Sequence, residues 1–144
     1  MQVESLVAAA DREIGTVTLA PQAYCQLHYL IARAGRGSPG LPDDLDMVDT
    51  SLHVDGTYRA PGSVTATPFT VHTPIANGAL FERTAASTPI RVDTGAAGAR
   101  VTVRRHLGSM FDAVDFAKMP DSVRAERVLA SVVRHAVVEI AAVE

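Results

Sequence analysis

Hydrophobic residues near the C-terminal end of the chain repeat at the spacing of an amphipathic helix. Between Asp121 and Glu144, apolar side chains recur at intervals of three and four, which places them on one stripe of a helix. Pro120 marks the start, and Asp121 or Ser122 is suited to capping the free N–H groups there. The pattern predicts a long helix over residues 121–143. Its stripe consists of Leu129, Val132, Val133, Ala136, Val137 and Ile140.

The N-terminal residues show two weaker patterns, the first with the spacing of a helix and the second with the alternation of a strand. Residues 2–12 have apolar positions at helical spacing and predict a short first helix. From Ile14 to Leu19 the pattern changes to alternation, with Val17 and Leu19 on one face and threonines between them. Because successive side chains of a strand point to opposite faces, this alternation predicts a strand.

A second main helix is predicted over residues 21–34. Pro21 suits the first helical position, and the glycines that follow Ala34 suit the end of the helix. Residues 35–46 combine glycine, proline and aspartate without periodicity, which indicates a loop. The apolar stripe of this helix is formed by Ala23, Leu27, Leu30 and Ala34.

The middle of the chain, residues 47–106, is rich in short alternating runs and predicts strands. Asp55-Gly56 lies between two such runs, and this pair is a strong signal of a tight hairpin turn. Pro61-Gly62 predicts the next turn. The further elements expected are a strand over 64–73, a turn over 74–79 centred on Asn77-Gly78, a strand over 80–83, a hairpin of 90–92 with 99–103, and a short helix over 110–119.

Together these elements predict an α+β fold in a single domain over residues 1–144. We expect one antiparallel β-sheet of about five to six strands, because sheets bury one face against other elements. Two main helices are expected to pack on it, one near the N-terminus and one at the C-terminus.

Composition narrows the classes of function. With 47% hydrophobic and 20% charged residues, the chain has enough apolar side chains to bury a core. A net charge of −3 argues against nucleic-acid binding through a broad basic surface. No apolar run approaches the ~20 residues that span a bilayer, and no signal-peptide pattern begins the chain. We expect a soluble protein without a membrane partner, in the cytoplasm or within a particle assembled there.

Arginines cluster on the last predicted hairpin. Alternation turns the apolar residues of its strands inward and the arginines outward. Arginine binds carboxylate and phosphate groups bidentately and is enriched at protein interfaces. We interpret these residues as a candidate interface or anion-binding surface, with a solvated face paired to Asp93 or Glu82 as the alternative. The residues are Arg91, Arg100, Arg104 and Arg105.

Three histidines on or beside predicted strands are candidate metal ligands. His53, His72 and His106 supply imidazole nitrogens, and Asp55 lies on the same strand face as His53. A site would require neighbouring strands whose order the sequence does not fix. The Asp-Gly turn already accounts for Asp55. No metal and no cofactor are therefore expected.

Other candidate chemistry is weaker. Cys25 and His28 are three residues apart on a predicted helix, where a nucleophile and its base rarely reach good geometry. The single cysteine also excludes an internal disulfide framework. The acidic loop that contains Asp43, Asp44 and Asp46 lacks the spacing of an EF-hand. Phosphate-binding, dinucleotide-binding and hydrolase motifs are absent from the sequence.

These observations favour a non-enzymatic structural or assembly protein. We expect it to form a homo-oligomer or to join other subunits in a larger particle, such as a virion, because loops and outward arginines offer contact surfaces and no catalytic arrangement stands out. The alternative is a small α+β enzyme or ligand-binding domain whose site is lined by histidine and arginine.

Overall fold

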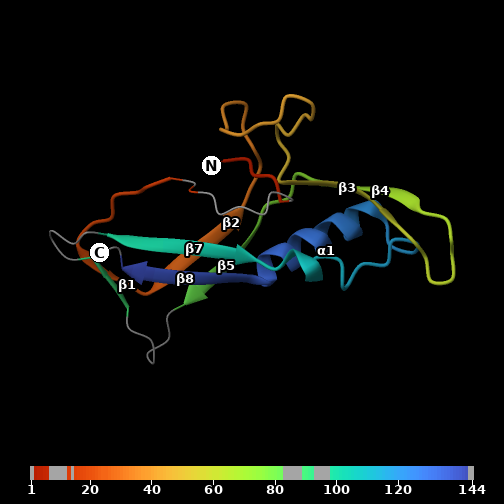
Figure 1. Ribbon diagram of the computed structural model, residues 1–144. Helices are drawn as coiled ribbons and strands as arrows, with labels where there is room; N and C mark the ends of the chain where they lie inside the picture. Colours follow the sequence, from red (N-terminus) through yellow and green to blue (C-terminus); the bar gives the residue numbers. More distant parts are fainter. Residues whose placement is uncertain (1, 7–12, 14, 83–88, 93–97, 143–144) are drawn as a thin grey trace.

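The computed structural model describes residues 2–6, 13, 15–82, 89–92 and 98–142. Within these residues the chain forms four two-stranded antiparallel sheets and one α-helix, so strands dominate the structure (Figure 1). The strands are β1 (Gln22–Tyr24), β2 (Gln26–Ile31), β3 (Leu52–Tyr58), β4 (Thr67–Thr73), β5 (Asn77–Glu82), β6 (Ile90–Val92), β7 (Ala99–Arg105) and β8 (Ala136–Ala142). The helix α1 spans Asp121–Arg134, and a short 3-10 helix spans Leu107–Ser109.

Three of the sheets are successive sections of one interrupted ribbon. β1 pairs with β6, β2 with β5, and β3 with β4. Strands β1 to β3 therefore run along one side of the ribbon and β4 to β6 along the other (Figure 1). Residues 32–51 leave the ribbon between β2 and β3 as a loop, which is closed at its base by a bridge between Ala34 and Val48.

A second ribbon is formed by β7 and β8, which are separated in sequence by α1. Their register places Val103 opposite Val138 and Val101 opposite Ile140. This non-local pairing joins the end of the chain to its middle. In Figure 1 the second ribbon crosses β2 and β5 and extends away from α1.

The core lies between α1 and one face of the first ribbon. Val128, Leu129 and Val132 on the helix are almost fully buried and pack with Leu52 and Val71 on β3 and β4. Burying each such side chain contributes about 1.5–3 kcal/mol, so this small cluster supplies much of the folding free energy.

Aromatic rings extend this core along the β3–β4 hairpin. Phe69 lies 4.3 Å from Phe116 and 5.7 Å from Phe111, measured between ring centroids, and Tyr58 stacks on Phe116 at 5.1 Å. The rings from the ribbon thus pack against the connection between the 3-10 helix and α1.

The predicted fold class, one sheet of five or six strands covered by two main helices, is wrong. The described strands form four separate sheets, and one helix packs on them. The helix predictions for residues 21–34 and 121–143 were wrong over all or part of their length. The short helix expected over 110–119 is a series of turns.

The region predicted as a helix over 21–34 forms strands β1 and β2. Leu27, Tyr29 and Ile31 are half-buried, and the residues between them are exposed, which is the period of a strand. A short apolar run is compatible with both the helical and the strand period, so the presence of a partner strand decides which of the two structures forms. Here β5 supplies that partner, from Gln26 opposite Glu82 to Ile31 opposite Asn77.

The C-terminal helix is real but shorter than predicted. It ends at Arg134, and the residues from Ala136 onward form β8. Val137, Val138 and Ile140 are β-branched, which favours a strand once β7 provides a pairing edge. The N-cap residue is Pro120, and neither Asp121 nor Ser122 caps the first turn.

The predicted turn at Asp55-Gly56 is also wrong, because both residues lie within β3. Gly56 pairs with Phe69 on β4, and a Cβ atom added to Gly56 would lie 2.8 Å from the Phe69 ring. The glycine therefore makes room for a packed aromatic ring. The hairpin turns at Pro61-Gly62, as predicted, where Gly62 has a φ of +79°.

Other local predictions have mixed outcomes. The loop over 35–46 is confirmed, and the strand over 64–73 is confirmed as the shorter β4. Asn77-Gly78 begins β5 and is no turn. The predicted hairpin of 90–92 with 99–103 is wrong, since β6 pairs with β1 and β7 with β8. Of the predicted first helix, residues 2–6 are not helical and residues 7–12 lie outside the described residues.

Candidate functional site

The four candidate arginines do not form one surface. Arg91 lies on β6, whereas the others lie on β7 in a different sheet. Within β7, alternation places Arg100 and Arg104 on one face and Arg105 on the other. The predicted basic surface is therefore divided into three environments.

Arg105 joins three segments of the chain. Its Nε atom donates a hydrogen bond to the Tyr29 hydroxyl on β2 at 2.8 Å, and its guanidinium also forms an ion pair with Glu4. The side chains of Arg105 and Glu4 are both largely buried. Burial opposes the charge on Arg105, but the hydrogen bond to Glu4 and the nearness of Tyr29 outweigh it and raise its pKa. Arg105 is thus a structural residue and is not available to an external anion.

The remaining arginines are exposed. Arg104 forms an ion pair with Glu139 on β8 at 3.2 Å, across the β7–β8 ribbon. Arg91 and Arg100 form no ion pair with another described residue. These two side chains lie on strands of separate sheets.

Two of the three candidate histidines come together on the first ribbon. His53 and His72 are directly opposite in the β3–β4 register, with ring centroids 5.9 Å apart. His53 also bonds Asp55 through Nε2 at 2.7 Å, and the Thr70 hydroxyl donates to the other carboxylate oxygen at 2.6 Å. The hydrogen bond from Thr70, followed by that with His53, lowers the pKa of Asp55.

The third histidine is elsewhere. His106 follows β7 and immediately precedes the 3-10 helix, so it lies outside the sheet that carries the pair on β3 and β4. Within the described part of the chain, no group of three histidine, cysteine, aspartate or glutamate side chains has a geometry that could hold a metal ion. On the outer face of β3 and β4, the side chains of His53 and Thr70 both bond to Asp55.

The weaker candidates also lack a reactive arrangement. Cys25 is exposed between β1 and β2, and His28 is three residues away in extended chain, where side chains point to opposite sides. Asp46 in the loop accepts a hydrogen bond from the backbone N–H of Val48 at 3.0 Å, so it shapes the loop.

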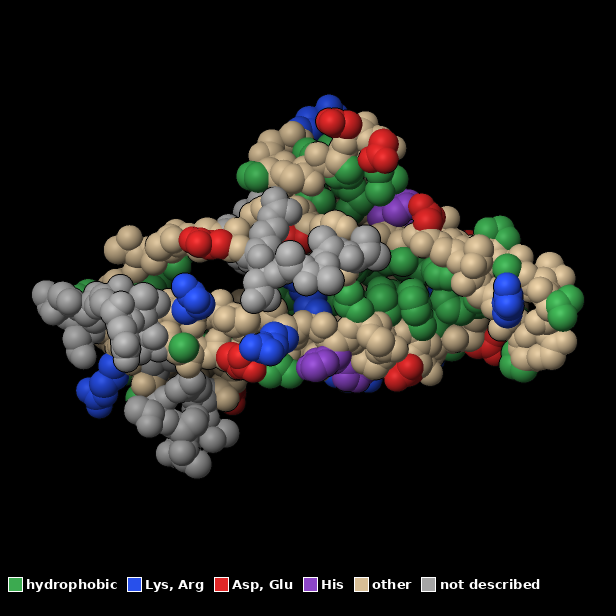
Figure 2. Space-filling model, viewed as in Figure 1, with side chains coloured by type: hydrophobic (Ala, Val, Ile, Leu, Met, Phe, Trp, Pro, Cys, Tyr) green, Lys and Arg blue, Asp and Glu red, His purple; other side chains and the backbone are tan. Residues whose placement is uncertain are grey.

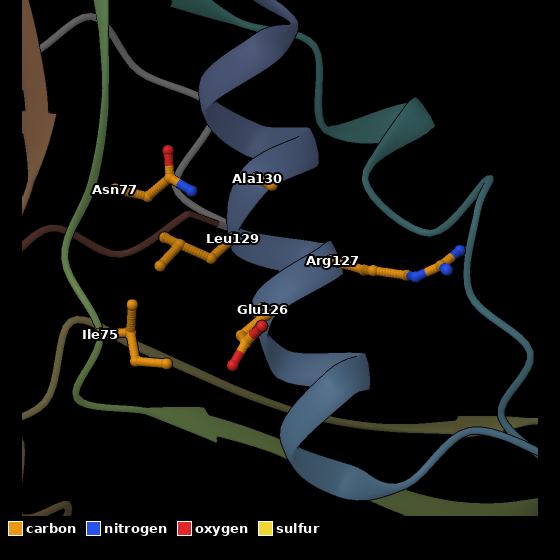
Figure 3. A pocket seen from close by; sticks show the side chains of 6 residues that line it. All are labelled: Ile75, Asn77, Glu126, Arg127, Leu129 and Ala130. Atoms are coloured by element: carbon orange, nitrogen blue, oxygen red, sulfur yellow. The ribbon is translucent and has the colours of Figure 1, made fainter.

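One groove lies between α1 and the chain that joins β4 to β5. It has a volume of about 420 Å³, and Ile75 and Leu129 form its apolar part (Figure 3). Figure 3 shows the Arg127 side chain extending away from it, and Arg127 donates instead to the carbonyl of Ala113. The groove offers few converging polar groups, which small-molecule sites use to fix their ligands. The lining residues are Ile75, Asn77, Glu126, Arg127, Leu129 and Ala130.

The large accessible surface is the feature that the sequence did not predict. The chain exposes 10130 Å², whereas a folded monomer of 15.2 kDa exposes roughly 7,100 Å². Hydrophobic side chains appear in several separate places on the face shown in Figure 2. Strand alternation was visible in the sequence, but which strands lack a second neighbour was not. The large exposed hydrophobic residues are Val17, Leu19, Leu30, Val64, Ile75, Leu80, Val101, Val123 and Val137.

Comparison with models of protein families finds no match, and comparisons with curated proteins and with solved structures find none either. Among the described residues, no helix has both the length and the apolar character needed to cross a membrane.

Proposed function

We propose that the protein is a non-enzymatic structural or assembly protein that forms a homo-oligomer, alone or within a larger particle. The observation that carries this proposal is the excess of accessible surface. The difference between 10130 Å² and the expected value is roughly 3,000 Å². A stable interface buries about 800 Å² per partner, so the excess exceeds what one such contact needs.

The sheets support the same proposal. Each described sheet has only two strands, so each strand has one side without a strand partner. Two-stranded sheets are marginally stable by themselves, and free edges pair readily with other chains. Exposed apolar side chains on both ribbons, such as Leu80 on β5 and Val137 on β8, are then suited to contacts between copies.

The test is the molar mass in solution, measured by light scattering over a dilution series and at two salt concentrations. We expect a discrete mass that is a multiple of 15.2 kDa and does not change with a chelator. A monomer at every concentration would contradict the proposal. A mass that falls on chelation would redirect attention to His53 and His72.

A further inference from the structure

Residues 15–20 form an extended segment with the pattern of a strand but without a strand partner. No backbone–backbone hydrogen bond joins them to another described residue. The side chain of Val17 is 77% exposed and that of Leu19 is 45% exposed. In Figure 1 the segment arcs away from the two ribbons, and Figure 2 shows an opening beneath it.

This exposure is unfavourable for such residues. Valine, leucine and threonine are suited to a pleated, half-buried surface, where their side chains pack against neighbours. Polar backbone groups also find their usual partners in a sheet. The segment therefore has the composition and alternation of a strand, but it lacks a neighbouring strand edge with which to pair.

The free edge of β8 fits this segment. Charged side chains protect strand edges, and β7 carries three arginines, whereas the one charged residue on β8 is Glu139, which is paired with Arg104. β8 is seven residues long and rich in β-branched residues. Proline interrupts β4, and glycine interrupts β3 and β5.

The two faces of β8 also match the two faces of the segment. Val138 and Ile140 lie on the apolar face of the second ribbon, and Val101, the partner of Ile140, is still 45% exposed. Val17 and Leu19 would continue that face. The threonines of the segment would then lie on the outer face, beside Glu139.

We infer that residues 15–20 of one copy add as a strand to the free edge of β8 in a second copy. This inference rests on the proposed function, because it names the contact through which the homo-oligomer forms. Each addition extends the two-stranded β7–β8 sheet to three strands and covers part of its apolar face.

The first experiment compares the dissociation of the oligomer on dilution for three variants. Val17→Asp places a charge on the apolar face, and Thr18→Pro removes a backbone N–H from the new strand. Both positions are exposed in the single chain, so circular dichroism is expected to stay unchanged. Val64→Asp is the matched control, because Val64 is 92% exposed outside this segment. We expect the first two variants to dissociate at a concentration at least tenfold higher, and the control to behave as the unaltered protein.

These outcomes separate the inference from the proposed function. A monomeric unaltered protein overturns both. An oligomer that neither Val17→Asp nor Thr18→Pro weakens overturns the strand addition and leaves the proposed function standing. An equal effect of Val64→Asp also overturns it, because the contact would not be specific to residues 15–20.

A second experiment tests the acceptor edge. In a Cys25→Ser background, copies with Thr18→Cys are mixed with tagged copies with Glu139→Cys, and a short bismaleimide is added. We expect cross-linked pairs of one tagged and one untagged copy. The control mixture replaces Thr18→Cys with Val64→Cys, and an equal yield from that mixture would overturn the assignment to β8.

Discussion

Arg105 and Tyr29 are joined by a hydrogen bond of 2.8 Å from the arginine Nε to the tyrosine hydroxyl. The bond connects β7 in the second ribbon to β2 in the first, and Glu4 completes the group from the N-terminal segment. Because the two ribbons pair with no common strand, this polar group is a direct link between them.

Replacing Arg105 should therefore destabilise the protein. We expect Arg105→Met to lower the free energy of unfolding by about 2 kcal/mol, because hydrogen bonds to charged groups contribute about 1.5–3 kcal/mol and Glu4 would lose its partner. Urea denaturation measures the effect. Arg104→Met is the control, since Arg104 is 65% exposed and its ion pair with Glu139 contributes at most about 1 kcal/mol. A larger loss from the control would show that Arg105 is not the link.

The strand face on which Arg105 lies could be predicted from the sequence, but its structural role could not. Strand alternation places Arg104 and Arg105 on opposite faces of β7, so the sequence already argued against one surface formed by all four arginines. The ion pair with Glu4, however, joins residues that are far apart in sequence. Pattern and spacing do not determine such contacts, because they depend on how the ribbons are placed.

Asp55 gives a prediction that depends on pH. Its pKa in the folded protein is below its usual value of 3.8, so the folded state binds a proton less readily than the unfolded state. Its contribution to stability is therefore present above the usual value and is lost as the pH falls through the lowered pKa. Thr70→Val removes the largest cause of this shift, and we expect the pKa of Asp55 to rise toward 3.8.

Carboxyl NMR titration measures the pKa of Asp55 in both proteins. The difference in thermal stability between them should also shrink as the pH is lowered from about 6 to below the pKa. Thr57→Val is the control on the same strand, because its hydroxyl forms no hydrogen bond with the described residues and its loss should leave Asp55 unchanged. An unaltered Asp55 pKa in Thr70→Val would refute this account of the shift.

Gly56 tests the packing of the aromatic core. We expect Gly56→Ala to lower the free energy of unfolding by about 1–3 kcal/mol, because the new Cβ atom would lie 2.8 Å from the Phe69 ring. Phe69 cannot easily yield, since Phe111 and Phe116 pack against it. Gly37→Ala is the control, as nothing lies within 4 Å of that position. Equal stability of the two variants, measured by thermal unfolding, would rule out the crowding at Gly56.

Local signals thus located many elements but often misjudged their type. The Asp-Gly pair had the chemistry of a turn, yet the glycine serves ring packing inside β3. The strands at 26–31 and 136–142 depend on partners that are 46 and 31 residues away, respectively, at their nearest paired ends, and such pairing overrides local helical spacing. The buried part of α1 was predictable because its period persists over several turns and matches its burial.

The apolar stripe of α1 gives the final prediction. Val133 is buried on the helix beside Val132, and Val133→Asp would place a charge where no partner is provided. We expect a loss of about 4 kcal/mol or more in the free energy of unfolding, which is enough to unfold the protein or dissociate its oligomer. Val123→Asp is the matched control, because Val123 is exposed in the first turn, where an acidic side chain suits the helix dipole. Circular dichroism and light scattering should show a folded control. A folded and unchanged Val133→Asp protein would mean that the stripe does not form the core, and the packing of α1 on β4 and β5 would then need another explanation.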